Sequence, residues 1–390
     1  MPAPPAPLDA PDVLVVNAGS SSLKLGRRPS GAGVVVERIG EPGQARDHVE
    51  AWRRAAAALS EAPDAAPLDR VAVVAHRMVH GGERYTEPVV VNDRVLEVLE
   101  GLVPLAPLHN PANLAALRAA RTALPGVPHV AVFDTAFHAT MAPHAFRYAV
   151  PEAWYREHGV RRYGFHGPSH DGVTRRAAAL LDRPREALRI VSLHLGNGAS
   201  AAAVDRGRSV ETTMGFTPID GLVMGTRSGS IDPGVLLHLL RSGKSAEDLD
   251  LELNRASGLL GLSGRSNDVR DLRRAADEGD ERAALALRAF AYRARLAIGS
   301  LAFAMGGLDA VVFTGGIGQH DARMRADVLG DLEAFGIGVD PRANRAHGPR
   351  IDAGGPVAVL VVATDEEGMM AQAALEAVGR PGAQAAGREA

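Results

Sequence analysis

Apolar runs that end in glycine, asparagine or serine recur along the chain, and two of them share one plan. Residues 189–204, RIVSLHLGNGASAAAV, predict a strand, a tight turn over Gly196, Asn197 and Gly198, and a returning strand. Residues 13–25, VLVVNAGSSSLKL, repeat this plan. Glycine in such a turn can adopt a positive φ and lets backbone N–H groups approach an anion such as a phosphate. Two such hairpins, far apart in the sequence, predict two related domains that face one bound nucleotide.

The remaining pattern alternates short apolar runs with longer helical stretches. Strands are predicted at 34–39, 71–75, 127–133, 311–313 and 357–362, and helices at 47–59, 93–102, 111–124, from 170 to about 181, and over most of 235–305 apart from 257–267. Residues 212–234 are rich in Gly, Thr and Ser and too long for a simple connection, which is typical of a functional loop. Strands that alternate with helices predict an α/β fold, in which ligands bind at the carboxyl ends of strands.

Composition narrows the class of protein. At 390 residues the chain exceeds what one hydrophobic core usually serves, which favours two domains. A net charge of −3 without a long basic run argues against nucleic-acid and anionic-membrane binding. The absence of cysteine excludes disulfides, thiolate catalysis and cysteine zinc sites, and it fits the cytoplasm. The proline-rich start lacks the features of an export signal, and Gly306, Gly307 and Asp309 break the most apolar run, 298–313. We expect a cytoplasmic protein with a small-molecule partner.

The first hairpin carries a polar face. The two-residue period of a strand places Ser20, Ser22 and Lys24 on one face and Leu23 and Leu25 on the other. An exposed polar strand face is the commoner explanation of such a pattern alone. The second glycine hairpin favours a functional one. No GxxxxGK[ST] motif occurs, which excludes a P-loop protein.

Two arginines are candidates for binding an anionic substrate. Arg77 and Val79 share one strand face, so a planar donor fork lies beside a small apolar wall, which suits a carboxylate with a short alkyl tail. A surface salt bridge is the commoner role of a single arginine. Arg227, in the long loop, could supply a second guanidinium, and two converging arginines would stabilise a charged transition state.

Acidic and histidine side chains follow several predicted strands. Asp134 ends a strand and is equally well explained as a ligand-positioning carboxylate or as a helix cap. His138, His166, His170 and His194 are more simply structural histidines than a metal cluster. We interpret His166, between two glycines, as a hydrogen-bond donor to a developing charge.

The residues after the last strand and the Gly315–Gly318 turn give weaker evidence of a binding site. Thr364 and Glu367 fit a capping box, which leaves Glu366 as a carboxylate able to reach a hydrated Mg²⁺. The glycine turn permits close backbone approach to a base or ribose.

Taken together, a series of blocks between residues 17 and 367 resembles the acetate kinase family, within the actin, sugar kinase and Hsp70-like superfamily. In chain order the blocks are NAGSSSLK, HRMVHGG, PLHNP, FDTAFH, RRYGFHGPSH, HLGNGAS, MGFTPIDGLVMGTRSG, FTGGIG and TDEE. The resemblance implies an α/β fold of two duplicated actin-like (ribonuclease H-like) domains with a nucleotide-binding cleft between them. The expected domains are 12–136 with 367–380, and 137–366, with disordered tails at 1–11 and 381–390.

The resemblance also implies reversible transfer of the ATP γ-phosphoryl group to acetate, by a homodimer that needs Mg²⁺, with Mn²⁺ as an alternative. Asn17 and Glu366 would hold the metal, and Arg77 the carboxylate or the transferring phosphoryl group. Asp134 would be the essential acid, with His166 and Arg227 as transition-state stabilisers. The nucleotide would contact Lys24, His194, Leu195, Gly196, Asn197, Gly198, Asp268, Val269, Arg270, Gly316, Ile317, Gly318, Gln319 and His320. The acetate methyl group would lie among Val79, Leu108, Phe165 and Pro218.

The chain departs from the family pattern at Pro168, Ser230, Gln319 and His320, which bears on nucleotide preference more than on reaction type. Two alternatives stay open. One is a sibling kinase for propionate or another short acid, since one methylene is worth only about 1 to 3 kcal/mol of discrimination. The other is a nucleotide-dependent binding or sensing protein without catalysis.

Overall fold

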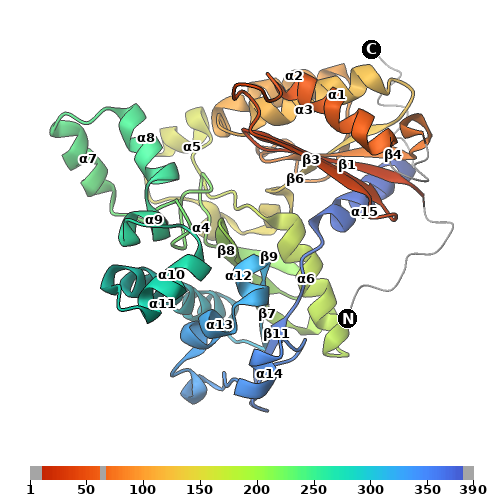
Figure 1. Cartoon of the computed structure of the whole chain (residues 1–390). Coiled ribbons are helices and arrows are strands. Elements are labelled where there is room, and N and C mark those ends of the chain that lie inside the picture. The colour runs from red at the N-terminus through yellow and green to blue at the C-terminus, as the bar shows by residue number, and fades with distance from the viewer. Residues whose placement is uncertain (1–10, 62–66, 381–390) are drawn as a thin grey trace. The chain divides into compact units, whose positions relative to one another are not determined.

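The computed structural model describes residues 11–61 and 67–380. Apart from Pro11, the predicted disordered tails lie outside these described residues. The chain forms two compact units: unit 1 takes the chain up to Ala136 and again from Asp365, and unit 2 is Phe137–Thr364 (Figure 1). Each unit contains one β-sheet with helices on its faces, which confirms the predicted α/β class.

The sheet of unit 1 has the strand order β3-β2-β1-β4-β6-β5. Its strands are β1 Val13–Ala18, β2 Ser22–Arg28, β3 Gly33–Glu37, β4 Val73–Met78, β5 Val89–Val90 and β6 His129–Phe133. The first hairpin is present as predicted, because β1 pairs with β2 antiparallel. Strands β1, β4 and β6 are parallel, so their carboxyl ends share one edge of the sheet.

Helices cover both faces of this sheet. Helices α1 His48–Ser60 and α3 Asn110–Ala123 share an apolar core with one face, which includes Leu14, Leu23 and Leu25. The last helix, α15 Glu366–Gly379, packs on the other face against Val13 and Val15 (Figure 1). The unit also contains α2 Asp93–Gly101 and the short 3₁₀ turns η1 Leu68–Arg70 and η2 Val103–Leu105; a third, η3 Ala136–Thr140, begins at its last residue before unit 2.

Unit 2 repeats the strand plan of unit 1. Its sheet has the order β11-β10-β7-β8-β9, formed by β7 Arg189–Leu195, β8 Ala199–Asp205, β9 Arg208–Thr212, β10 Ala310–Thr314 and β11 Ala358–Val361. An antiparallel β7-β8-β9 meander continues into the parallel strands β10 and β11, as β1-β2-β3 continues into β4 and β6. The equivalent topology confirms the duplication predicted from the two hairpins.

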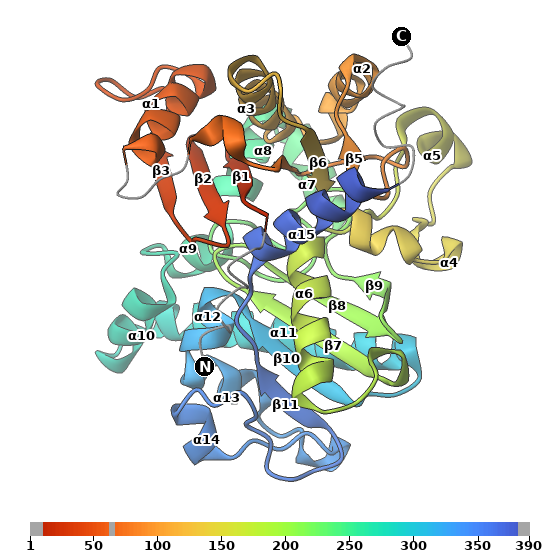
Figure 2. The same ribbon diagram turned by 90° about the vertical axis from the view of Figure 1, so that its right-hand side faces the viewer.

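The helices of unit 2 form layers on both sides of its sheet. Figure 2 shows α6 Gly167–Leu180 on one face and α11 Glu281–Met305 on the other. The remaining helices are α4 Pro143–Phe146, α5 Glu152–His158, α7 Pro233–Arg241, α8 Ala246–Arg255, α9 Gly258–Ser263, α10 Val269–Asp277, α12 Gly315–His320, α13 Ala322–Leu329 and α14 Pro341–Arg345, with 3₁₀ turns η4 Arg185–Ala187 and η5 Glu333–Phe335. None of the helices in the described part of the chain is both long and apolar enough to cross a membrane.

Three local predictions were wrong. The interruption predicted at 257–267 contains helix α9, and the predicted glycine turn after β10 is itself helical, as α12. The last helix is capped by Asp365, whose carboxylate accepts from Gly368 N at 3.0 Å, and not by Thr364. The Thr364 hydroxyl instead bonds to Ser169 Oγ at 3.0 Å, a long-range contact that the local capping pattern does not reveal.

Candidate active site

The ends of β4 and β6 in unit 1 bring Arg77 and Asp134 together. The guanidinium donates to both carboxylate oxygens, from Nε to Oδ1 at 2.9 Å and from Nη2 to Oδ2 at 2.7 Å. Asp134 is buried, so this fork-to-carboxylate pair is shielded from water on the carboxylate side. The Asp134 carboxylate raises the pKa of Arg77, which stays charged at any working pH. Asp134 therefore orients Arg77 and is not a helix cap.

Asn17 and Glu366 lie near the same pair. Asn17 Oδ1 accepts from Arg77 Nη1 at 3.3 Å. Burial raises the pKa of Glu366 and the carboxylates of Asp134 and Glu367 add to this effect, whereas the charge of Arg77 opposes it. The region thus gathers oxygen ligands and negative charge at one edge of the sheet.

These oxygen atoms fit Mg²⁺ or Mn²⁺ chemically. Within the described ranges, no three His, Cys, Asp or Glu side chains form a complete metal cage. Mg²⁺ usually keeps several waters and binds through one or two carboxylates plus substrate phosphates, so an incomplete cage is what such an ion needs.

Lys24 is held by a partner that the sequence did not predict. Its register partner in β1 is Asn17, as the hairpin requires. Its ammonium pairs with Glu367 Oε1 at 2.5 Å, and Glu367 also accepts from Arg28 Nη2 at 2.9 Å. A Cβ at Gly26 would lie 2.7 Å from Glu367 Oε2, so a larger residue there would make the carboxylate shift. The predicted phosphate contact of Lys24 would compete with this ion pair.

Asn113, on α3, was missed by sequence reasoning and links two predicted site segments. Its Oδ1 accepts from Val79 N at 3.1 Å, and its Nδ2 donates to Ala18 O at 2.6 Å, next to Asn17. The side chain of Val79 is buried and that of Leu108 is exposed. The only available signal for Asn113 was a polar residue on the apolar side of a helix.

In unit 2, the β7–β8 turn lies beside His166 and Arg227. Neither Gly196 nor Gly198 has a positive φ, contrary to our expectation. A Cβ at Gly198 would make a tight contact, 3.3 Å from Arg227 Nη2, and would lie 3.6 Å from His166 Nε2. The turn therefore brings an imidazole and a guanidinium together.

His166 has an unusual backbone. It precedes α6 with φ 58° and ψ 25°, the left-handed region that non-glycine residues seldom adopt. Its ring stacks on His194 with centroids 4.3 Å apart, and its Nδ1 bonds to Ser200 Oγ at 2.8 Å. Ser169 Oγ lies 2.8 Å from His194 Nδ1. The strained backbone aims the ring at the glycine turn.

The long loop is fixed to the hairpin. Arg227 Nη1 donates to Pro218 O at 2.9 Å, and Gly225 N donates to Asn197 O at 2.8 Å. Asn197 Oδ1 also accepts from Asn267 Nδ2 at 2.8 Å. The carbonyl of the buried Phe165 accepts from His138 Nε2 at 2.9 Å. These contacts bring Phe165, His166, Pro218 and Arg227 into one part of unit 2 with the hairpin residues.

The predicted nucleoside residues have clear structural roles. Asp268 caps α10, accepting from Arg270 N at 2.8 Å, and its hydrogen bond from the Arg270 side chain lowers the pKa of Asp268. Val269 is buried at the start of that helix, and Arg270 is almost fully exposed.

Arg325 is a further residue that the sequence did not reveal. Although fully buried, it donates from Nη1 to the carbonyls of Gly318 and Gln319 at 2.8 and 2.9 Å, and from Nε to Asn344 Oδ1 at 2.7 Å. It therefore holds the end of α12, where Gly316, Ile317, Gly318, Gln319 and His320 lie.

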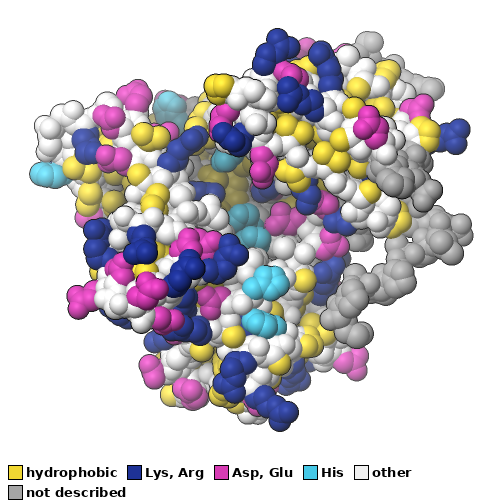
Figure 3. All heavy atoms as spheres, in the orientation of Figure 1, with side chains coloured by type: hydrophobic (Ala, Val, Ile, Leu, Met, Phe, Trp, Pro, Cys, Tyr) yellow, Lys and Arg dark blue, Asp and Glu magenta, His cyan; other side chains and the backbone are white. Residues whose placement is uncertain are grey.

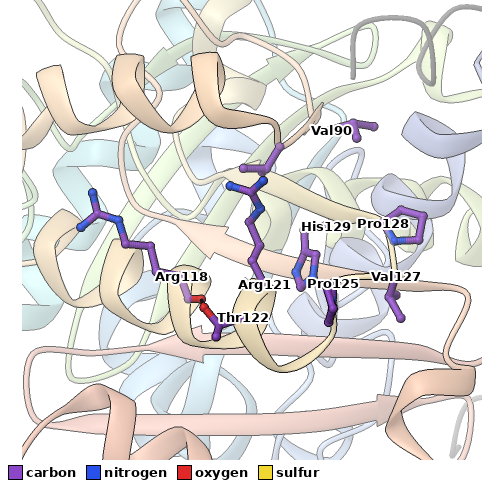
Figure 4. Close-up of a pocket in the computed structure, with 9 residues that line it drawn as sticks. Val90, Arg118, Arg121, Thr122, Pro125, Val127, Pro128 and His129 are labelled. Atoms are coloured by element: carbon purple, nitrogen blue, oxygen red, sulfur yellow. Dashed lines mark hydrogen bonds between the residues drawn. The ribbon is translucent and has the colours of Figure 1, made fainter. Parts of the chain in front are cut away.

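An open pocket lies in unit 1, away from the Arg77–Asp134 pair. It has a volume of about 490 Å³ and is lined by Arg118, Arg121, Thr122 and His129, among others (Figure 4). His129 begins β6, whereas Asp134 follows its other end. The face of the molecule in Figure 3 intersperses basic and acidic side chains, in keeping with the low net charge.

Two α/β units that repeat one strand plan, with basic, acidic and histidine side chains gathered at strand ends, define a phosphotransferase with two actin-like domains. The model of the Acetokinase family matches residues 34–372. The acetate kinase of Pseudarthrobacter chlorophenolicus is 49% identical over 94% of this chain and 99% of its own, and that of Deinococcus radiodurans is 48% identical over 95% and 98%.

Solved structures agree with the sequence relatives. The acetate kinase of Porphyromonas gingivalis matches with a TM-score of 0.88 at 39% identity, covering 94% of this chain and 99% of its own. A propionate kinase from Francisella tularensis matches with a TM-score of 0.89 at 35% identity, covering 94% and 100%. The chain belongs to the acetokinase family, which confirms the family predicted from the sequence blocks.

Proposed function

We propose that this protein reversibly transfers the γ-phosphoryl group of ATP to acetate, giving acetyl phosphate and ADP. In unit 2, His166 Nε2 and Arg227 Nη2 both approach Gly198, and this arrangement supports the proposal most directly. An imidazole and a guanidinium beside a glycine turn suit a phosphoryl group that carries negative charge through its transfer. The activities named for the two bacterial relatives support the same reaction.

The reaction requires the protein mainly to position the substrates and to offset the negative charge of the phosphoryl group. Acetate is already a nucleophilic carboxylate, so no strong base is needed. Arg77, oriented by Asp134, would bind the acetate carboxylate or the transferring phosphoryl group. His166 and Arg227 would donate to the phosphoryl oxygens, and Val79, Leu108, Phe165 and Pro218 would surround the methyl group.

Asn17 and Glu366 would hold Mg²⁺, or Mn²⁺, through their oxygen atoms. The bound cation would offset phosphate charge and the carboxylate charge near Glu366. Lys24 and residues 194–198 would bind the nucleotide phosphates, and residues 268–270 and 316–320 its nucleoside.

Propionate is the second candidate substrate, because one solved relative is named a propionate kinase. The buried Val79 favours the smaller acid, since a smaller residue there would leave more room for a longer chain. We expect a higher kcat/KM for acetate than for propionate, measured with one enzyme preparation and saturating ATP. A higher kcat/KM for propionate would identify propionate as the preferred substrate.

A binding or sensing role without catalysis is the rival from another class. Acyl-hydroxamate formation from acetate, ATP, Mg²⁺ and hydroxylamine separates the two roles. We expect colour well above the control without enzyme. Folded protein that gives none would support the binding role.

We also propose that the protein is a cytoplasmic homodimer with domains 12–136 plus 367–380 and 137–366. Helix α7 supports self-association, because it contains no buried residue yet exposes Leu237 and Leu240, which lie three residues apart on one helix face. A second copy of this chain is the occupant that we assign to this apolar face.

A further inference from the structure

Two histidines and two serines in unit 2 form a continuous row of hydrogen bonds. His166 Nδ1 lies 2.8 Å from Ser200 Oγ, which in turn lies 2.8 Å from His170 Nε2. His170 Nδ1 lies 3.0 Å from Ser192 Oγ. The row therefore leads from the ring beside Arg227 into the interior of the unit.

The fold brings these four residues together from three elements. His166 immediately precedes α6 and His170 lies in its first turn, and both rings bond to Ser200 in the sheet. Ser200 in β8 pairs with His194 in β7, and Ser192 lies two residues before His194 on the same strand face. His170, Ser192 and Ser200 are fully buried, so neighbouring protein groups must satisfy their polar atoms.

His170 can carry only one ring proton in this row. Burial lowers the pKa of His170 well below its usual value, and the neighbouring His138 and His194 add to the effect. A neutral imidazole offers one donor and one acceptor. Ser200 has one hydroxyl proton, so it can donate to one histidine while it accepts from the other.

Ser192 decides the direction of the row. Among the residues that the structure describes, His170 Nδ1 is the hydrogen-bond partner found for the Ser192 hydroxyl. If His170 Nδ1 carried the proton, the Ser192 hydroxyl proton would be buried without an acceptor, which is costly. The favoured order is therefore Ser192 to His170 Nδ1, His170 Nε2 to Ser200, and Ser200 to His166 Nδ1.

We propose that Ser192, His170 and Ser200 are positioning residues that hold His166 in the tautomer with its proton on Nε2, the nitrogen beside Gly198 and Arg227. A ring fixed in this way presents a hydrogen-bond donor to an incoming anion before the anion arrives. The catalytic consequence rests on the function proposed above, in which His166 donates to the transferring phosphoryl group. The tautomer itself does not depend on that function.

His138 supplies a matched comparison in the same unit. Its Nδ1 lies 2.8 Å from Ser209 Oγ, and its Nε2 donates to the Phe165 carbonyl. A carbonyl can only accept, so this tautomer is set without the row that leads to His166. Ser209 is as buried as Ser200, so Ser209→Ala removes an equivalent serine–histidine bond elsewhere.

Nitrogen NMR of ring-labelled protein tests the tautomer in the free enzyme near neutral pH, with the His166 signals assigned from a His166→Gln variant. We expect an unprotonated Nδ1 and a protonated Nε2 for His166. In Ser200→Ala both signals should move toward values averaged over the two tautomers, whereas in Ser209→Ala they should not move. A protonated Nδ1 in the parent protein, or unchanged His166 signals in Ser200→Ala, would overturn the proposal.

Kinetics test the consequence. We expect Ser200→Ala to lower kcat for acetyl phosphate formation about ten-fold with little change in KM, since partners that orient an active group often carry effects of about this size. Ser209→Ala should keep a kcat near that of the parent protein. Equal kcat values for the two variants would contradict the positioning role. An inactive parent protein whose NMR signals match the expectation would instead contradict the proposed function alone.

Discussion

At the residue scale, Arg227 is the side chain whose loss should affect the reaction most. Its Nη1 is held by the Pro218 carbonyl, and its Nη2 faces Gly198 and the ring of His166. Arginines that stabilise a transferring phosphoryl group can be worth about 10³-fold or more. We expect Arg227→Ala to lower kcat by about three orders of magnitude, measured with acetate and MgATP, while the far-ultraviolet circular dichroism stays unchanged. A near-normal kcat would remove Arg227 from its assigned role.

The buried pair of His76 and His129 should make stability depend on pH. His76 Nε2 lies 2.9 Å from His129 Nδ1, and burial lowers the pKa of His129 from 6.5 to about 4. The unfolded chain therefore binds a proton between these values that the folded chain does not, and the folded state loses stability as pH falls through this window.

A single shift of this size corresponds to on the order of 3 kcal/mol in the free energy of unfolding. We expect denaturation midpoints to fall between pH 6.5 and 4, and to fall less steeply in His129→Gln. Above pH 7 the two curves should run parallel and serve as the internal control. Curves that stay parallel throughout the acid range would show that His129 does not make stability depend on pH.

At the scale of elements, the β7–β8 turn is the critical feature of unit 2. A Cβ at Gly198 would approach Arg227 Nη2 to 3.3 Å, so Gly198→Ala should displace the guanidinium by a few tenths of an ångström. Because transition-state stabilisation depends on such geometry, we expect kcat to fall about ten-fold or more, with little loss of thermal stability. Kinetics and thermal denaturation together measure both effects.

Gly299→Ala is a suitable control for Gly198→Ala, since a Cβ on that residue of α11 would meet no atom within 4 Å. The control should keep full activity and gain slightly in stability, because alanine favours a helix interior. If Gly198→Ala behaved like this control, the turn would not position Arg227.

The local pattern was sufficient to predict most elements and the key ends of strands. Two-residue periodicity located both hairpins, and the polar residues after β4 and β6 did meet, as Arg77 and Asp134 show. The capping pattern gave the wrong cap for the last helix, because Thr364 and Asp365 both fit that position. Thr364 bonds to Ser169 instead, and Asp365 caps the helix.

What the sequence could not predict depends on contacts between distant segments. Arg325 binds carbonyls at the end of α12 and Asn344, and Glu367 pairs with Lys24 across most of the chain length. The row through Ser200 likewise joins α6 to two strands. The local sequence pattern cannot predict these bonding partners, because each contact depends on how separate elements pack against one another.

At the scale of the whole molecule, α7 should mediate self-association. Its exposed Leu237 lies on an apolar helix face without a buried residue. We expect the protein to elute as a dimer in size-exclusion chromatography with light scattering, and Leu237→Glu to shift it toward the monomer. Leu180→Glu, an exposed leucine at the end of α6, is the matched control and should stay dimeric. A monomeric parent protein, or a dimer unaffected by Leu237→Glu, would exclude this surface.

The reaction proposed for this chain moves a phosphoryl group between ATP and acetate. Phosphorus NMR tests it directly, with the purified protein, Mg²⁺ and either acetate plus ATP or acetyl phosphate plus ADP. We expect acetyl phosphate to appear in the first mixture and ATP in the second, at rates proportional to enzyme concentration. Folded protein that binds ATP but converts neither mixture would show that the chain does not catalyse this transfer.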